Sequence, residues 1–431
     1  MRWLAVDLGL LERGQVEAVS RVSPSSDDGA IRALMAAGGS AAGLAHLSQV
    51  QDDERIPFLV CVGNAVVRGL PTAARATVLG RSPLTGRPAE GQVGSDLAAR
   101  LAQTLDVLVL EGRATRPGTL LVVGEEGQVE LYTDPSLEGL DPEELHDRIV
   151  ARFGDCATLR VGAAGLAGLP IAHLAAGSRP ASRVGRGGLG AAFGRLGLTA
   201  LVVRTAPVEG TGDPDLVRWL TGSPRLSVRA LDGTFELASA LGARGDLRTR
   251  GQQEVVDPAA AVELTDEAKG AAHERHGCKG CPTPCGWTFK NPDDSPRGAR
   301  FSAHHALGTN LGFADFQAGA ALLARCDAFG VDAKEVGAGL ALLARKREEE
   351  GASVWGQLEV FEGWIDEMVE GEGEAALLGQ GSEALARELG LVDEQVAASG
   401  EAVRLDGDLA VLLGSCVAVR GAEPMLSLIH I

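Results

Sequence analysis

The first 205 residues contain short apolar runs that are rich in β-branched residues and end at Gly, Pro or Asp. Runs of this length and composition predict buried β-strands. A helix is predicted at 95–105 from apolar residues at helical spacing, and another begins after Asp141, which Pro142 follows. Residues 29–50, rich in Ala and Gly, fit either a helix pair or a loose segment. The predicted strands include residues 58–62, 107–110, 120–123 and 201–203.

Beyond residue 313 the apolar positions recur at helical spacing. A helix is predicted over 313–328, ended by Gly330. The sequence Asp332-Ala-Lys-Glu335 is typical of a capping box and predicts a helix that reaches about residue 350. Further amphipathic helices are predicted at 354–369 and 382–389, the second with Ser382 as its N-cap.

Together the two patterns predict an α+β protein in which a β-rich domain precedes α-helices. We expect the β-rich domain at 1–205 and an α-helical domain with a cysteine loop at 206–415, which opens with a linker and short helices. Residues 416–431 are expected to start a further domain that the chain does not complete. The last six residues, 426–431, resemble a translated sequencing adapter, so we expect a C-terminally truncated fragment.

Composition limits the class of protein. The chain has 431 residues, 45% of them hydrophobic, which is enough for two or three domains with real cores. Its 58 glycines indicate many tight turns and close backbone approaches. A net charge of −18 argues against nucleic acid and anionic membranes as partners. Because no signal peptide and no membrane-spanning run is found, we expect a cytoplasmic protein with reduced thiols.

The strongest chemical signal is the loop Cys278-Lys-Gly-Cys281-Pro-Thr-Pro-Cys285-Gly286, which has three thiols at the spacing C-x2-C-x3-C. Its two prolines exclude a regular helix, and Gly280 and Gly286 are predicted to supply positive φ angles. Thiols gathered on such a loop bind an iron–sulfur cluster or zinc.

Zinc and disulfide bonds are the alternatives to an iron–sulfur cluster at this loop. A structural zinc would need a fourth ligand, from His276 or a distant Cys. Seven cysteines in 431 residues are too few for a disulfide scaffold. The spacing reverses that of radical-SAM loops, and a ferredoxin run has one more Cys. We favour one iron–sulfur cluster with three local ligands and one remote ligand. Cys61, Cys156 and Cys326 are predicted to be packed in cores.

Two stretches rich in Gly and Arg, 75–94 and 183–190, precede the cysteine loop. The string Gly185-Arg-Gly-Gly-Leu-Gly190 lacks the preceding strand and following acid of a dinucleotide-binding loop. Its backbone N–H groups, with Arg179, Arg183 and Arg186, instead indicate a phosphate-binding segment. A Gly-rich turn with exposed arginines is the alternative.

These stretches together resemble the tungsten-dependent aldehyde:ferredoxin oxidoreductase family. Each motif alone is weak, but the motifs keep the family's order and similar separations from about residue 58 to 345. Residues 1–57 resemble the family only loosely. The motifs are Ser82-Pro-Leu-Thr-Gly86, Gly185-Arg-Gly-Gly-Leu-Gly190, Cys278-x-x-Cys281-Pro-x-x-Cys285-Gly286, Ala306-Leu-Gly-Thr-Asn-Leu-Gly312 and Cys326-Asp-Ala-Phe-Gly-Val-Asp332.

The resemblance implies that residues 1–205 form a β-rich base for a bis-pterin cofactor of tungsten or molybdenum, over which helical domains close. It also implies a [4Fe-4S] cluster that passes electrons to ferredoxin. The implied reaction is the oxidation of an aldehyde, with water, to a carboxylic acid. The resemblance allows for a homo-oligomer and leaves the substrate and the choice of metal open.

The site residues that the resemblance implies can be placed one by one. Cys278, Cys281 and Cys285 match three cluster ligands. Arg75 matches the arginine between cluster and pterin, where its fork would anchor a phosphate. Asp332 could both cap a helix and contact the cofactor. The other positions that match cofactor contacts are Gln92, Gly94, Ser182, Arg183, Gly185, Arg186, Asp327 and Val331.

The chain also departs from the family pattern. Gln92 stands where the family has Asn, and Ser182 where it has Arg, although Arg183 is adjacent and is a candidate substitute. Ser302 stands at the position of an acid near the metal and cannot act as a general base. His304 and His305 are candidate replacements, and exposed surface histidines are the alternative. The family's fourth cysteine lies in a domain that we expect the chain to lack, and Cys416 is outside that motif.

Three hypotheses for the function follow. The first is an aldehyde oxidoreductase with no catalytic residue yet assigned. The second is a non-catalytic iron–sulfur electron-transfer or scaffold subunit, which the residues at 92, 182 and 302 suggest. Arg75 and Arg186 argue against it, because such a subunit needs no phosphate anchor. The third is a zinc-binding module.

Overall fold

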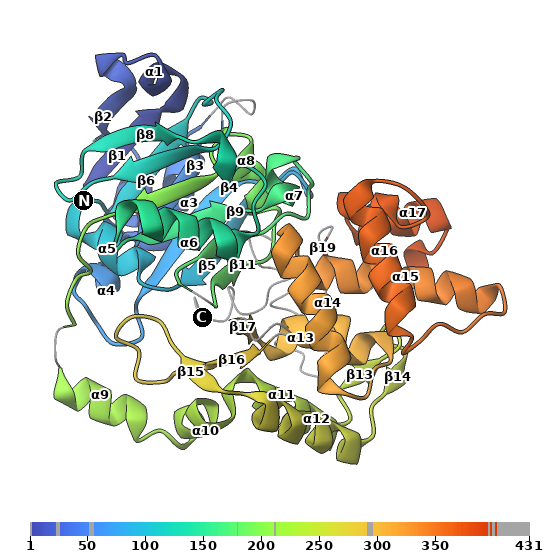
Figure 1. Ribbon diagram of the computed structural model, residues 1–431. Coiled ribbons are helices and arrows are strands. Elements are labelled where there is room, and N and C mark those ends of the chain that lie inside the picture. The colour runs from blue at the N-terminus through green and yellow to red at the C-terminus, as the bar shows by residue number, and fades with distance from the viewer. Residues whose placement is uncertain are drawn as a thin grey trace. The chain divides into compact units, whose positions relative to one another are not determined.

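The computed structural model describes residues 2–22, 26–50, 56–178, 180–210, 213–290, 296–394, 397–398 and 401–402 (Figure 1). The chain forms two units. The first comprises Met1–Gly168, Ala172–Ser223 and Gly277–Thr283, and the second comprises Leu169–Ile171, Pro224–His276 and Pro284–Ile431. None of the helices in the described ranges has the length and hydrophobicity of a membrane span.

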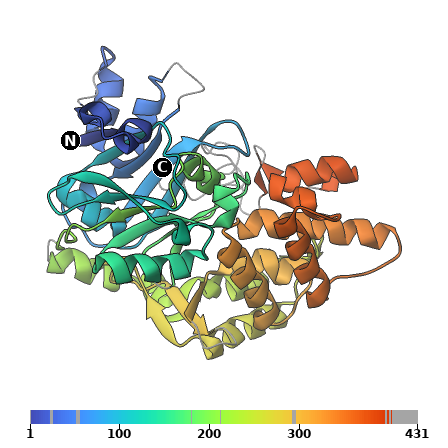
Figure 2. The ribbon, with the colours of Figure 1, turned by 45° about the horizontal axis from the view of Figure 1, so that its top comes forward.

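Two six-stranded sheets build the first unit, coloured blue to green in Figures 1 and 2. The first sheet has the order β2-β1-β6-β3-β4-β5, in which only the pair β1–β6 is parallel. Its strands are β1 (Trp3–Asp7), β2 (Val19–Val22), β3 (Phe58–Val62), β4 (Arg75–Arg81), β5 (Pro88–Gly94) and β6 (Val107–Glu111).

The second sheet has the order β11-β10-β9-β12-β7-β8, with β12 and β7 parallel. Its strands are β7 (Thr119–Val123), β8 (Val129–Thr133), β9 (Ala157–Val161), β10 (Leu174–Ala176), β11 (Ser182–Val184) and β12 (Ala200–Val203). The helices of the first unit are α1 (Leu8–Glu12), α2 (Gly29–Ala37), α3 (Gly39–Leu47), α4 (Asn64–Val67), α5 (Leu97–Thr104), α6 (Pro142–Phe153), α7 (Ala163–Leu166), α8 (Leu189–Gly194) and α9 (Pro214–Thr221).

Among its described residues, three apolar clusters hold this unit together. The largest joins the facing sides of both sheets with α5 and α8. The opposite face of the first sheet packs against α3, and the opposite face of the second packs against α6. Alternate residues of β3 therefore enter different clusters: Phe58 and Val60 belong to the largest, while Leu59 and Cys61 face α3. Burial on both sides explains why this strand was predicted at its observed bounds.

The second unit is mainly helical. Its helices are α10 (Pro224–Asp232), α11 (Glu236–Arg244), α12 (Pro258–Ala271), α13 (Phe301–Leu307), α14 (Phe316–Phe329), α15 (Ala333–Glu349), α16 (Leu358–Glu370) and α17 (Ser382–Leu389). Its strands are β13 (Arg248–Thr249), β14 (Glu254–Val255), β15 (Glu274–His276), β16 (Gly286–Lys290), β17 (Pro296–Ala299), β18 (Ala397–Ala398) and β19 (Glu401–Ala402). The predicted α+β class, with sheets before helices, is confirmed.

The helix caps confirm some predictions and correct others. Asp141 caps α6, and Gly330 ends α14 in the left-handed region with φ of 92°. Asp332 caps α15, but the predicted capping box is wrong because the Glu335 carboxylate accepts hydrogen bonds from the Ser382 N–H and hydroxyl instead. Ser382 is accordingly the first residue of α17, after the N-cap Gly381. The Glu335 carboxylate thus binds Ser382, 47 residues away, and does not close the local capping box.

A fully buried guanidinium ties the second sheet to α6. Arg160 of β9 is 0% exposed. It donates to the carbonyl of Pro142 at 2.6 Å, to that of Gly177 at 2.7 Å and to the hydroxyl of Thr158, and it lies 3.6 Å from the Glu143 carboxylate. Burial lowers the pKa of Arg160 to about 10, so that the side chain stays charged at neutral pH.

We expect Arg160→Met to destabilise the protein by on the order of 3–5 kcal/mol, because the half-buried carboxylate of Glu143 loses one of its partners and two carbonyls lose a donor. Arg148→Met on the exposed side of α6 is the control. It removes only a surface pair with Glu144 and should cost less than about 1 kcal/mol. Denaturant unfolding measures both, and equal midpoints for the two variants would contradict the assigned role of Arg160.

Candidate cofactor site

The β4–β5 hairpin brings three of the predicted cofactor residues to one end of the first sheet. Arg75 is the register partner of Gly94, and Thr77 that of Gln92. The Arg75 side chain is exposed and donates one hydrogen bond to the Gln92 carbonyl at 3.4 Å. In the described residues it forms no ion pair with a carboxylate, so its fork stays available to an anion.

Gly94 is the point where the cysteine loop meets this hairpin. A Cβ at position 94 would lie 2.1 Å from the Cys278 sulfur, which is far inside van der Waals contact. The next residue of the loop, Lys279, donates its backbone N–H to the Ser95 carbonyl at 3.4 Å. Glycine at 94 therefore makes room for a half-buried thiol.

The cysteine loop has no helix, as its prolines predict. The Cys281 N–H donates to the Cys278 carbonyl at 3.0 Å, and Gly280 has the predicted positive φ, at 68°. The prediction of a positive φ at Gly286 is wrong. Gly286 is required instead because a Cβ there would lie 2.3 Å from the His276 ring nitrogen Nε2.

The three thiols are half-buried, and each has a different environment. Cys278 and Cys281 belong to the first unit and Cys285 to the second. The Cys281 thiol donates to the Thr283 carbonyl at 3.4 Å, while the Cys285 sulfur accepts from Arg300 Nη1 at 3.6 Å. Across the described part of the chain, no three His, Cys, Asp or Glu side chains are grouped as metal ligands.

The donors nevertheless have the chemistry that an iron–sulfur cluster needs. Half-buried thiols, the space at Gly94 and a guanidinium on one sulfur all fit thiolate ligands. His276, the candidate zinc ligand, has its pKa lowered to about 4 by burial and by the nearby Arg300 charge. Cys416, the other candidate, lies outside the described residues. Cys61, Cys156 and Cys326 are buried, as predicted.

The second Gly-rich stretch follows β11 beside the same hairpin. A Cβ at Gly91 of β5 would lie 2.2 Å from Val184, so the two strands approach closely. Ser182 shares a strand face with Val184, and Arg183 lies on the other face. Gly187 and Gly188 then turn the chain with φ of 79° and 61°. The stretch brings Gly185 and the buried side chain of Arg186 next to this turn. Arg179 is outside the described residues.

Arg183 contacts an acid on α6. Its Nη2 donates to Glu143 at 2.9 Å, and the Ala181 N–H donates to the same oxygen at 3.0 Å. Burial would raise the pKa of Glu143, but the charges of Arg183 and Arg160 outweigh burial and hold it below the ordinary value. Arg183, the candidate substitute for the arginine that the family has at position 182, is thus paired with Glu143.

The remaining predicted cofactor residues lie around the start of α15. Asp327 is half-buried in the last turn of α14, and Val331 is fully buried. The Asp332 carboxylate accepts a hydrogen bond from the Lys334 N–H at 2.9 Å. The backbone N–H of Asp332 donates to the Ile171 carbonyl at 2.9 Å. The cap role of Asp332 is confirmed, and its contact with a cofactor stays a prediction.

The two histidines near Ser302 are buried, so the surface alternative is wrong. His304 Nε2 lies 2.8 Å from the Phe316 carbonyl, and its ring stacks on Phe316 at 4.7 Å. Burial lowers the pKa of His304 to about 4, and the ring is part of an aromatic core. His305 Nε2 lies 3.0 Å from the Arg248 carbonyl. Ser302 itself is exposed.

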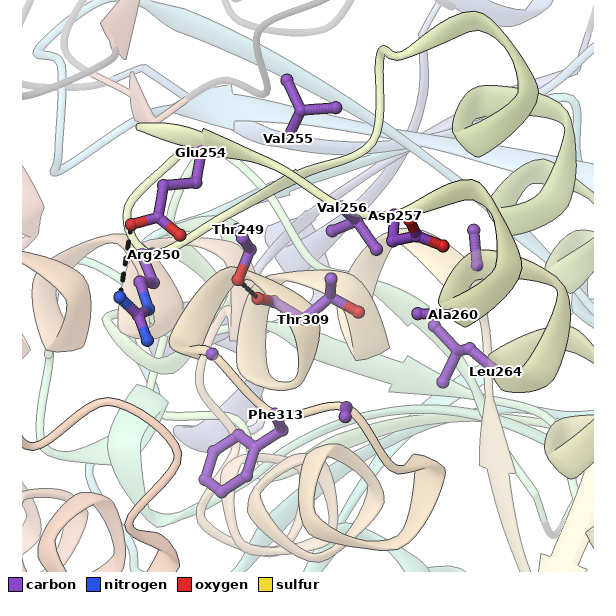
Figure 3. Close-up of a pocket in the computed structure, with 13 residues that line it drawn as sticks. Thr249, Arg250, Glu254, Val255, Val256, Asp257, Ala260, Leu264, Thr309 and Phe313 are labelled. Carbon is purple, nitrogen blue, oxygen red and sulfur yellow. Dashed lines mark hydrogen bonds and ion pairs between the residues drawn. The ribbon is translucent and has the colours of Figure 1, made fainter.

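A cavity of about 250 Å³ lies in the second unit, beside the β13–β14 hairpin, the start of α12 and residues 309–314 (Figure 3). Arg250 pairs with Glu254 at 3.2 Å on its rim. Thr249 donates to the Thr309 carbonyl at 2.6 Å, and Gly251 donates to that of Asn310 at 2.9 Å. The motif at 306–312 therefore holds this hairpin, and none of the predicted cofactor residues lines the cavity.

Sequence reasoning missed Glu143, Arg160 and Arg300. Glu143 looks like an ordinary acid in the first turn of a helix, and Arg160 sits in an otherwise apolar strand. The position of Arg300 beside the cysteine loop depends on strand register, which no local pattern reveals.

Two parts of one family match the chain. Residues 30–205 match "Aldehyde ferredoxin oxidoreductase, N-terminal domain", and residues 215–422 match "Aldehyde ferredoxin oxidoreductase, domains 2 & 3". The tungsten-containing aldehyde ferredoxin oxidoreductase of Pyrococcus furiosus is 27% identical over 357 residues, which cover 77% of this chain and 58% of that protein. The Pyrococcus abyssi protein is also 27% identical, over 80% of this chain and 61% of its own length. The chain spans less than two thirds of these relatives.

A solved structure has the same fold. It is the active site complex BamBC of benzoyl coenzyme A reductase with 1,5-dienoyl-CoA, with a TM-score of 0.78 and 17% identity over 98% of this chain and 69% of that one. Because the sheet-rich and helical parts both match one family in chain order, the chain belongs to the aldehyde ferredoxin oxidoreductase family.

Proposed function

We propose that the protein oxidises an aldehyde at a tungsten or molybdenum bis-pterin and passes the electrons through a [4Fe-4S] cluster to ferredoxin. An aldehyde and water give a carboxylic acid, two protons and two electrons, and two ferredoxins take one electron each. When bound, the metal–pterin and the cluster supply this redox chemistry, and the chain supplies binding and orientation. The name of the relatives includes both tungsten and ferredoxin.

The observation that carries the proposal is the arrangement around Gly94. The exposed Arg75 fork is its register partner, and the Cys278 thiol fills the place of its missing side chain. An arginine for a phosphate and a thiol for a cluster thus lie at one strand end. A scaffold subunit that had lost the pterin would have no need of this arginine.

The chain's own residues have separate tasks in this proposal. Arg75, Gln92 and the glycines at 94 and 185 bind the cofactor, together with Ser182, Arg183 and Arg186. Asp327, Val331 and Asp332 are proposed as further cofactor contacts. Cys278, Cys281 and Cys285 ligate the cluster. Ferredoxin is the proposed partner, and the protein is proposed to act in the cytoplasm.

The segment around Ser302 favours a second candidate, the non-catalytic electron-transfer or scaffold subunit. Ser302 is exposed and has no carboxylate, and the rings of His304 and His305 are engaged with backbone carbonyls. Helix α13 therefore offers no general base to water. The cluster loop would remain useful to such a subunit.

Metal analysis separates these candidates. We expect protein purified without oxygen from its full reading frame to contain about four iron and one tungsten or molybdenum per chain. Activity with a panel of aldehydes and a viologen acceptor would then identify the substrate. Iron without tungsten or molybdenum would favour the electron-transfer subunit, and zinc alone would refute both.

Gly94→Ala tests the thiol position directly. Its Cβ would push the Cys278 sulfur away at a cost of about 1–3 kcal/mol, so we expect loss of most iron and faster alkylation of Cys278 in metal-free protein. Gly63→Ala in the same unit is the matched control, since no atom lies within 4 Å of its added Cβ and its φ is −81°. Equal iron content in the two variants would show that Gly94 does not place a ligand.

A further inference from the structure

A three-stranded sheet places an arginine beside the last thiol of the cysteine loop. In this sheet, β15-β16-β17, Gly286 pairs with His276 and Trp287 pairs with Ala299. One further step of the antiparallel register sets Arg300 opposite Gly286, the residue after Cys285. Backbone pairing thus brings Arg300 close to a thiol 15 residues earlier in the chain.

The Arg300 side chain contacts this thiol. Its Nη1 donates to the Cys285 sulfur at 3.6 Å, which is within range for a hydrogen bond to sulfur. Both residues are half-buried. In the described segments Arg300 forms no ion pair with a carboxylate, so its charge acts on the sulfur without a closer acid.

His276 of β15 lies in the same row of the sheet, on the other side of Gly286 from Arg300. Its Nδ1 lies 3.4 Å from the Thr288 hydroxyl of β16. In this row the Arg300 guanidinium is the group that contacts the Cys285 sulfur.

We propose that Arg300 is a positioning residue that acts through Cys285 and raises the midpoint potential of the cluster. The inference rests on the proposed cluster. One-electron reduction adds negative charge that spreads onto the ligand sulfurs. An N–H donor and a positive charge at one sulfur stabilise the reduced form more than the oxidised form. Without Arg300 the cluster would be a stronger reductant.

The test is a redox titration of the holoprotein, with dithionite as one-electron donor and the signal of the reduced cluster followed by electron paramagnetic resonance. For Arg300→Met we expect about a tenfold lower equilibrium constant for reduction, which is about 59 mV for a one-electron couple. Arg300→Gln keeps an N–H donor without the charge, so its midpoint potential should lie between those of Arg300→Met and the wild type.

Arg275→Met is the matched control. Arg275 lies in β15 of the same sheet, is exposed and donates to the Ala230 carbonyl at 2.8 Å, so this variant loses the same charge without a thiol contact. Its potential should equal that of the wild type.

The outcomes separate this inference from the proposed function. A wild-type protein without iron would overturn both. Iron-loaded Arg300→Met with the wild-type potential would overturn only the role of Arg300. If that variant fails to hold iron, Arg300→Gln decides, and a potential at or above that of the wild type refutes the inference. A shift in the midpoint potential of Arg275→Met equal to that of Arg300→Met would refute the inference, because it would show that charge without a thiol contact has the same effect.

Discussion

The candidate site depends on a buried charge in the second sheet. Arg160 is surrounded by acceptors from α6, from the end of β10 and from its own strand. Glu143, which lies next to it, also holds the Ala181 N–H and Arg183. Gly177, Ala181 and Arg183 are thus held by hydrogen bonds and an ion pair. Since a buried guanidinium without these partners is costly, the network favours the observed arrangement. That arrangement sets where the Gly-rich stretch begins.

Close backbone approaches then bring the site residues together. Gly91 admits Val184, Gly94 admits Cys278, and Gly190 lies against the His173 carbonyl, where an added Cβ would be only 2.3 Å away. At none of these positions does the need for glycine come from φ. Each is a place where a side chain would separate two segments. The high Gly content of the chain therefore reflects packing as well as turns.

The sequence predicted what local pattern determines. Strand 58–62 has its predicted bounds because it is apolar and buried on both faces, and α15 starts at its predicted cap. The β4–β5 hairpin was described only as a stretch rich in Gly and Arg, because its Arg, Gln and Glu residues hide strands that pairing alone defines. Glu335 was misassigned since its partner is distant in sequence. The cofactor residues were identified from motifs, and their roles stay predictions. The contact between Arg300 and Cys285 could be found only from the strand register of β16 and β17.

Both ends of the cysteine loop are next to an arginine without a carboxylate partner in the described residues. Arg75 pairs with Gly94, which the Cys278 thiol contacts, and Arg300 contacts the Cys285 sulfur. In a chain with a net charge of −18, most arginines could find an acid nearby. Negative charge on a group bound to those thiols would be stabilised by both guanidinium groups. The distribution of charge is therefore compatible with the iron–sulfur site that the spacing of the cysteines predicts.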